Sequence, residues 1–96
     1  MRPSQALRQH RDAIRRIVES HRAGNARVFG SVLSREDAEG SDLDLLVDPA
    51  PGMSLFDIGA IQAEVSELLG IPVDVVTPRA LPDRWRERVL SAAEPV

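Results

Sequence analysis

The sequence predicts one domain of the α/β (α+β) class, with a small sheet of three or more strands flanked by helices in two or three layers. Three observations predict it: apolar residues recur at helical spacing in separate segments, short apolar strand-like runs lie between them, and glycine or proline divides the segments. The 96 residues, 43% of them hydrophobic, suit one domain with a modest core.

A helix is expected over about residues 3–21, because apolar residues fall near one stripe among arginines. Gly24-Asn25 is expected to stop this helix. A short strand at 27–29 follows and ends at Gly30-Ser31, where one helical turn is expected to begin. The apolar stripe consists of Leu7, Ile14, Ile17 and Val18.

The second strand and the middle helix have clear boundary signals. A strand at 41–48 is closed by the proline- and glycine-rich run at 48–52, which neither strand nor helix tolerates. Ser54 predicts a helix N-cap, with Asp57 in the capping-box position, and Gly70 predicts the end of that helix. Its expected apolar face is Leu55, Ile58, Ile61, Val65, Leu68 and Leu69.

The last part of the chain adds a strand and a helix. A third strand is expected at 71–77, followed by a loop that Pro78 and Pro82 punctuate. An amphipathic helix at about 83–92 then carries Trp85, which is interpreted as its packing anchor, with a contact to a partner as the alternative.

Composition excludes several kinds of site. The absence of cysteine excludes disulfides, thiolate zinc sites and thiol nucleophiles. All 12 basic residues are arginine, which excludes the P-loop lysine and Schiff-base chemistry. No apolar run approaches the roughly 20 residues of a membrane span and no signal peptide follows Met1, so we expect a cytoplasmic protein without a membrane partner.

The charges are unevenly distributed. Residues 1–29 carry seven arginines against two acids, whereas residues 30–78 carry one arginine against ten acids. This asymmetry predicts a surface with separate basic and acidic regions. The pI of about 5.3 argues against nucleic acid as a partner.

Two aspartates interrupt the second strand. Asp42 and Asp44 are two residues apart and therefore point to one face, about 6.6 Å apart along the strand, while Leu43 and Leu45 point to the other. Asp74 interrupts the third strand in the same manner. If the two strands are neighbours, three carboxylates meet on one face and repel one another.

Divalent cations would make such a cluster tolerable. Oxygen ligands alone favour Mg²⁺ or Mn²⁺, and two such ions about 3.5–4 Å apart form the clamp used for in-line attack at phosphorus. Upstream, Gly30-Ser31 lies where a strand passes into a short helix. Glycine permits close approach of a ligand to the backbone there, and free N–H groups favour an anion, so a bound polyphosphate is expected beside the metal.

Gly30-Ser31, ten intervening residues and Asp42-Leu43-Asp44 resemble the GS-x10-D-x-D signature of the DNA polymerase β-like nucleotidyltransferase superfamily. The stretches "RVFGSVLSREDAEGSDLDLLV" and "LGIPVDVVTPRAL" are similar to the minimal nucleotidyltransferase (MNT) antitoxins, which are single domains of about this size. The resemblance covers roughly residues 10–92. It implies a palm-type mixed sheet, two Mg²⁺ ions held by Asp42, Asp44 and Asp74, and phosphates bound by Gly30 and Ser31.

The resemblance also implies a reaction and a partner. In that family the partner is a HEPN-domain RNase toxin, silenced by adenylylation of a tyrosine hydroxyl with ATP as donor, in a type VII toxin–antitoxin system. A hetero-oligomer is therefore expected, and because this chain has no tyrosine, a tyrosine acceptor must belong to another chain. Asp74 is the candidate acceptor of the hydroxyl proton.

Arg35 departs from the family pattern. Relatives often read G-S-x-A-R-G, whereas here the arginine stands one place later and the second glycine is missing. The resemblance makes Arg35 a candidate nucleotide-binding residue. The alternative is a surface arginine that balances Glu36 and Asp37.

Other functions stay open at this point. An MNT-like chain without activity could neutralise its toxin by binding alone. An active chain could transfer nucleotides to an RNA 3′ end or to a small hydroxylated molecule. A purely structural α/β domain is the third alternative. The three aspartates argue against complete loss of activity.

Overall fold

Helices and strands alternate along the chain in the predicted order, with one added strand after the last helix. The computed structural model describes residues 1–34 and 36–96. The elements are α1 (Pro3–Ser20), β1 (Ala23–Phe29), α2 (Ser31–Ser34), β2 (Leu43–Pro49), α3 (Leu55–Leu69), β3 (Val73–Val76), the 3₁₀ turn η1 (Pro78–Ala80), α4 (Asp83–Ala92) and β4 (Glu94–Pro95).

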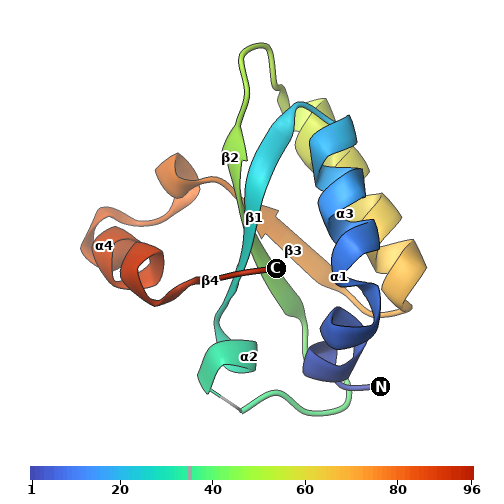
Figure 1. Cartoon of the computed structure of the whole chain (residues 1–96). Helices are drawn as coiled ribbons and strands as arrows, with labels where there is room; N and C mark the ends of the chain where they lie inside the picture. Colours follow the sequence, from blue (N-terminus) through green and yellow to red (C-terminus); the bar gives the residue numbers. More distant parts are fainter. Residues whose placement is uncertain (35) are drawn as a thin grey trace.

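The four strands form one mixed sheet in the order β3-β2-β1-β4. The first strand, β1, is antiparallel to both β2 and β4, whereas β2 and β3 are parallel and are joined by α3. Figure 1 shows α1 and α3 side by side against one face of this sheet and α4 on the other side. The expected α/β class with a small sheet flanked by helices is confirmed.

The hydrophobic core fills the space between the sheet and the α1–α3 pair. The central strand β2 sends Leu43, Leu45 and Val47 into it, all with no exposed surface. Full burial of an aliphatic side chain contributes about 1.5–3 kcal/mol, so this face provides most of the stability of the fold. The helices add Ile14 and Val18 from α1 and Ile61 and Val65 from α3.

The boundaries of α3 follow their local signals. The Ser54 hydroxyl accepts a hydrogen bond from the Phe56 N–H at 3.2 Å, and the Asp57 carboxylate accepts one from the Ser54 N–H at 2.9 Å. Gly70 ends the helix in the left-handed conformation, with φ of 71°. The predicted capping box and terminator are confirmed.

The expected extent of α1 is confirmed to within one residue, but its expected stop signal, Gly24-Asn25, is wrong. The helix ends at Ser20, and Arg22, not a glycine, takes the left-handed conformation with φ of 59°. Gly24-Asn25 lies within β1, where the pairing with β2 shifts register, so the strand begins earlier than 27–29. The strand β4 was not predicted, because only its pairing with β1 defines it.

Three apolar side chains expected to pack are exposed. On α3, Leu55 is 86% exposed and Leu68 is 37% exposed, although both fall on the predicted apolar face. On α4, Trp85 is 42% exposed, so its interpretation as a packing anchor is wrong. Among the described residues, no helix combines the length and the apolar character that crossing a membrane requires.

Candidate active site

Two of the three predicted aspartates are direct neighbours in the sheet. Asp44 of β2 and Asp74 of β3 are register partners in the parallel pair, and adjacent strands lie about 4.8 Å apart. Asp42 immediately precedes β2. The condition on which the sequence argument depended, that the second and third strands are neighbours, is therefore confirmed.

These three residues, here called the carboxylate cluster, belong to the face of the sheet opposite α1 and α3. Leu43 and Leu45, which alternate with them along β2, are fully buried in the core. Asp44 is half-buried, while Asp42 and Asp74 are exposed. The aspartates therefore do not take the place of any apolar residue in the core.

The cluster carries uncompensated negative charge. Burial raises the pKa of Asp44 above the ordinary value of 3.8, and the carboxylates of Asp74 and Asp42 raise it further. No ion pair between described residues involves any of the three. As oriented, the acidic and histidine side chains of the described residues form no group of three that could hold a metal ion, so closing the cluster on a cation requires side-chain rotation.

Gly30 brings the backbone against this cluster. Its φ is +79°, and a Cβ added there would lie 2.4 Å from Asp44 Oδ2, closer than any real contact. Phe29, the residue before it, is the register partner of Asp44. Ser31 follows as the first residue of α2 and is half-buried. The predicted Gly30-Ser31 element is thus adjacent to Asp44, and only glycine fits at its first position.

The loop between α2 and β2 is attached to α1. Asp37 Oδ2 accepts a hydrogen bond from the Ser4 N–H at 3.0 Å, and this bond lowers the pKa of Asp37 below its ordinary value. Arg35, the candidate nucleotide-binding residue of this loop, lies outside the described residues.

An apolar groove between α2 and α4 opens beside the cluster. It includes Gly30, so it reaches the residue that contacts the Asp44 carboxylate. No side chain of α4 is fully buried. The groove is lined by Phe29, Gly30, Leu33, Ser34, Arg88, Val89 and Ala92. The sequence analysis missed this groove, although a tryptophan and arginines one helical turn apart on α4 are a detectable signal.

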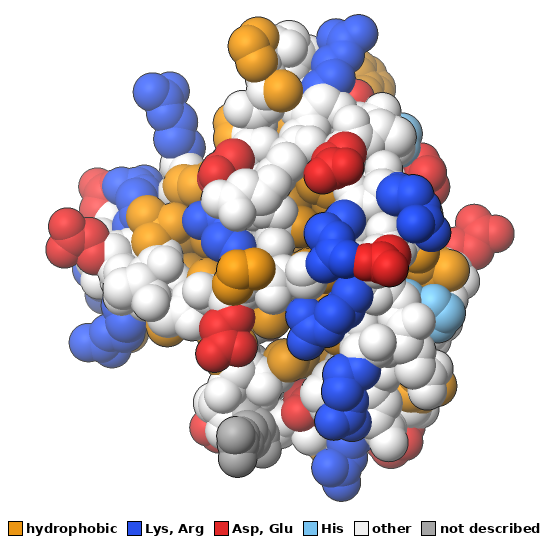
Figure 2. Space-filling model, in the orientation of Figure 1, with side chains coloured by type: hydrophobic (Ala, Val, Ile, Leu, Met, Phe, Trp, Pro, Cys, Tyr) orange, Lys and Arg blue, Asp and Glu red, His pale blue; other side chains and the backbone are white. Residues whose placement is uncertain are grey.

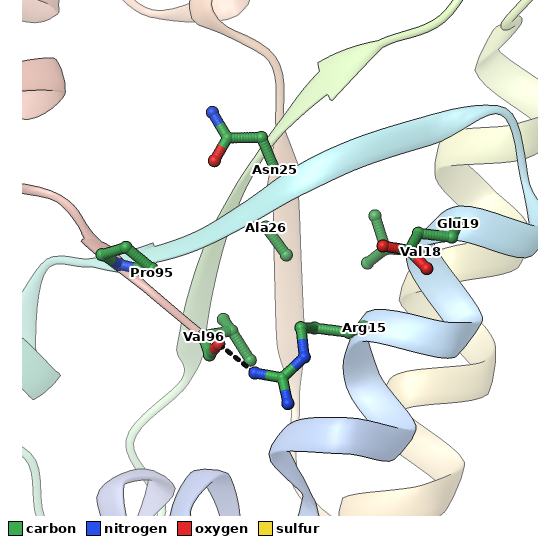
Figure 3. A pocket seen from close by; sticks show the side chains of 7 residues that line it. All are labelled: Arg15, Val18, Glu19, Asn25, Ala26, Pro95 and Val96. Carbon is green, nitrogen blue, oxygen red and sulfur yellow. Dashed lines mark hydrogen bonds between the residues drawn. The ribbon is translucent and has the colours of Figure 1, made fainter.

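A second, smaller hollow lies between α1, β1 and β4 and has no cluster residue in its wall (Figure 3). There the Arg15 guanidinium donates a hydrogen bond to the Val96 carbonyl oxygen, and Arg11 donates one to the Pro95 carbonyl oxygen at 3.3 Å. Its polar groups therefore hold the C-terminal segment against α1. The hollow is lined by Arg15, Val18, Glu19, Asn25, Ala26, Pro95 and Val96.

Comparison with known proteins agrees with this arrangement. Residues 7–94 match the family model described as a nucleotidyltransferase domain. A candidate protein adenylyltransferase of Methanocaldococcus jannaschii is 36% identical over 77 residues, which cover 80% of this chain and 83% of that protein. A second candidate protein adenylyltransferase of the same organism is 32% identical over 75 residues, covering 78% of this chain and 74% of that protein.

Solved structures show the same fold. The structure of a candidate minimal nucleotidyltransferase is 42% identical, with a TM-score of 0.86 over 97% of this chain and 95% of that chain. A toxin–antitoxin complex with AMP-PNP is 17% identical, with a TM-score of 0.73 over 88% of this chain and 69% of that chain.

The family match and the adenylyltransferase relatives show an enzyme of the nucleotidyltransferase class, which uses a nucleotide as substrate. The chain belongs to the nucleotidyltransferase domain family, and within it to the minimal type.

Proposed function

We propose that this chain is a Mg²⁺-dependent protein adenylyltransferase that transfers AMP from ATP to a hydroxyl group of a HEPN-domain RNase toxin, and so acts as the antitoxin of a type VII system. The observation that carries the proposal is the register pairing of Asp44 with Asp74 beside Gly30. The names of the M. jannaschii relatives support a protein acceptor, and the toxin–antitoxin neighbour supports a toxin as partner.

The donor set of the cluster suits a divalent cation. Carboxylate oxygens without histidine or cysteine favour Mg²⁺, with Mn²⁺ as the alternative, and substrate phosphates and water would complete the coordination of two ions at these three carboxylates. Asp42 and Asp44 would hold the ion that binds the triphosphate, and Asp74 would share the second. Ions bound there would neutralise charge on the phosphates and lower the pKa of the acceptor hydroxyl.

The residues of the chain then have distinct tasks. The absence of a side chain at Gly30 lets its backbone lie against the Asp44 carboxylate, so that a phosphate bound by this backbone would be next to the cluster, and the Ser31 hydroxyl donates a hydrogen bond to the far phosphates. Arg35 contributes a guanidinium to the same phosphates. The acceptor oxygen attacks the α-phosphorus, the bond to pyrophosphate breaks, and Asp74 accepts the hydroxyl proton.

The acceptor hydroxyl is on another molecule. We propose a tyrosine, which this chain lacks, so the reaction joins two different chains and requires a hetero-oligomer at least transiently. Because Asp44 and Asp74 belong to the face of the sheet opposite α1 and α3, the acceptor and ATP would both approach that face.

The test is transfer of label from α-labelled ATP, with Mg²⁺, to a HEPN-domain RNase from the same genome. Asp42→Asn/Asp44→Asn is expected to lose transfer on the order of 10²–10³-fold or more. Asp48→Asn is the matched control, because it removes a charge from the same strand at a residue that pairs with Arg27 outside the cluster. Label that persists in the double variant, or is lost equally in the control, would refute the site.

The same experiment separates the alternatives. Toxin that is neutralised by the double variant without any label indicates neutralisation by binding alone. Label recovered on RNA or on a small molecule, and not on the toxin, indicates a different acceptor for the same enzyme.

A further inference from the structure

The helix α4 is held in place without a buried side chain. Its attachment is the Arg86 guanidinium, which donates to the carbonyl oxygens of Pro78 at 2.9 Å and Leu81 at 2.8 Å, next to η1. Figure 1 shows α4 standing apart from the α1–α3 layer, on the side of the sheet opposite it. A helix placed this way presents a side-chain stripe to solvent rather than to the core.

That stripe combines an aromatic ring with unpaired cations. Trp85, the only tryptophan, is 42% exposed, and the guanidinium carbons of Arg84 and Arg88 lie 5.5 and 5.3 Å from its ring centroid. Among the described residues, no acid forms an ion pair with either arginine. Figure 2 shows hydrophobic, basic and acidic side chains together over α4, at the left of the view. Exposed tryptophan and arginine are the residues most enriched at binding hot spots.

The stripe leads toward the carboxylate cluster. Trp85 stands one turn before Val89 on α4, and Arg88 and Val89 line the apolar groove whose wall also includes Gly30. Gly30 in turn contacts the Asp44 carboxylate. A chain lying along α4 and the groove would therefore carry one of its side chains to the cluster.

We propose that the stripe of Arg84, Trp85 and Arg88, with the adjoining groove, is the docking surface for the protein acceptor, and that it takes an acidic segment bearing the acceptor tyrosine. Charge complementarity selects this occupant, because the two free guanidiniums attract carboxylates while the cluster itself repels them. The tyrosine ring fits the apolar groove and its hydroxyl points on to Asp44. The inference rests on the proposed protein acceptor and identifies its class.

The test uses Trp85 as its own reporter. A random copolymer of glutamate and tyrosine is expected to shift the Trp85 emission saturably, and a copolymer of lysine and tyrosine is expected to leave it unchanged. Arg84→Glu/Arg88→Glu is expected to raise the Kd for the acidic copolymer by about tenfold or more, and Arg84→Gln/Arg88→Gln by less. Arg8→Glu/Arg16→Glu, the matched control on exposed arginines of α1, is expected to stay within about twofold.

Absence of an emission shift, or equal weakening by the α4 and α1 variants, would overturn the docking surface. Labelling with α-labelled ATP separates this failure from that of the proposed function. If the Arg84→Glu/Arg88→Glu variant labels the copolymer or the toxin with an unchanged KM, only the proposed docking surface is refuted. If the acidic copolymer binds as expected but label is found only on RNA, only the proposed protein acceptor is refuted.

Discussion

Gly30 shows how a single residue joins the candidate phosphate-binding element to the carboxylate cluster. Two constraints exclude a side chain there: the positive φ, and the Asp44 oxygen 2.4 Å from the place that a Cβ would occupy. Gly70 has a similar φ of +71° but no atom within 4 Å of its Cβ position. A side chain at Gly70 would therefore have only the unfavourable backbone conformation, whereas a side chain at Gly30 would also collide with Asp44.

Gly30→Ala is expected to lose nucleotidyl transfer by about a hundredfold, because the new methyl group displaces the Asp44 carboxylate. Gly70→Ala carries only the conformational cost of about 1–2 kcal/mol, which lowers Tm and leaves transfer intact below the transition. Thermal melts and initial rates on the two variants make the comparison. Equal loss of activity in both would show that the contact with Asp44 does not matter.

At the scale of elements, α4 depends on one side chain. Arg86 also donates to Asp83 Oδ1 at 2.7 Å, so one planar guanidinium connects the first turn of α4 to the segment around η1. A lysine cannot reproduce this set of bonds, because its ammonium group is a single point. The Arg86 hydrogen bonds thus help to set the position of the docking stripe, on a helix without a fully buried side chain.

Arg86→Lys is expected to increase amide hydrogen exchange in α4 and η1 by about tenfold or more, with β1, β2 and α3 unchanged, since those elements share the core on the other face. Arg84→Lys is the control, because Arg84 is exposed and its guanidinium, which lies over the Trp85 ring, makes no hydrogen bond to a described residue. Exchange that rises across the whole sheet would mean that α4 stabilises the fold itself.

Capping and helix-terminating residues predicted the boundaries of the elements in which they occur. The capping box at Ser54 and the terminator Gly70 set the limits of α3 correctly, and Gly30-Ser31 marked the start of α2. Gly24-Asn25 misled, because the same residue types that end helices also occur at irregularities in strands. No local signal exists for the two residues of β4, which pair with β1 only through the fold of the whole chain.

The candidate site shows the same division. Alternation along β2 placed Asp42 and Asp44 on the face opposite Leu43 without any knowledge of the fold. The proximity of Asp74 could only be a condition, because parallel pairing of β2 with β3 joins residues 30 positions apart. The exposure of Trp85 was mispredicted, since helical spacing shows which residues share a face but not what covers that face.

At the scale of the whole molecule, the two faces of the sheet act in opposite directions on stability. One face buries the apolar core against α1 and α3, and the other carries three carboxylates that repel one another. Asp44 binds its proton more tightly in the folded chain than in the unfolded one, because its folded pKa is raised. Its contribution to stability is therefore complete at low pH and is lost as the pH rises above 3.8 and through the raised value.

Asp44→Asn is therefore expected to raise Tm at pH 7 in EDTA by a few degrees, since about 1 kcal/mol corresponds to roughly 4–8 °C in a domain of 60–100 residues, while it abolishes transfer. The gain should shrink below pH 3.8, where the wild-type carboxyl is protonated in both states. Added Mg²⁺ should raise the Tm of the wild type and not that of the variant, since only the native cluster binds it. Asp48→Asn, which breaks the pair with Arg27, is the control and should not raise Tm. The measurement is a set of thermal melts of the wild type and both variants across pH and Mg²⁺ concentration. A lower Tm for Asp44→Asn in EDTA at pH 7 would mean that the folded chain already compensates this charge, and that the cluster does not need a cation.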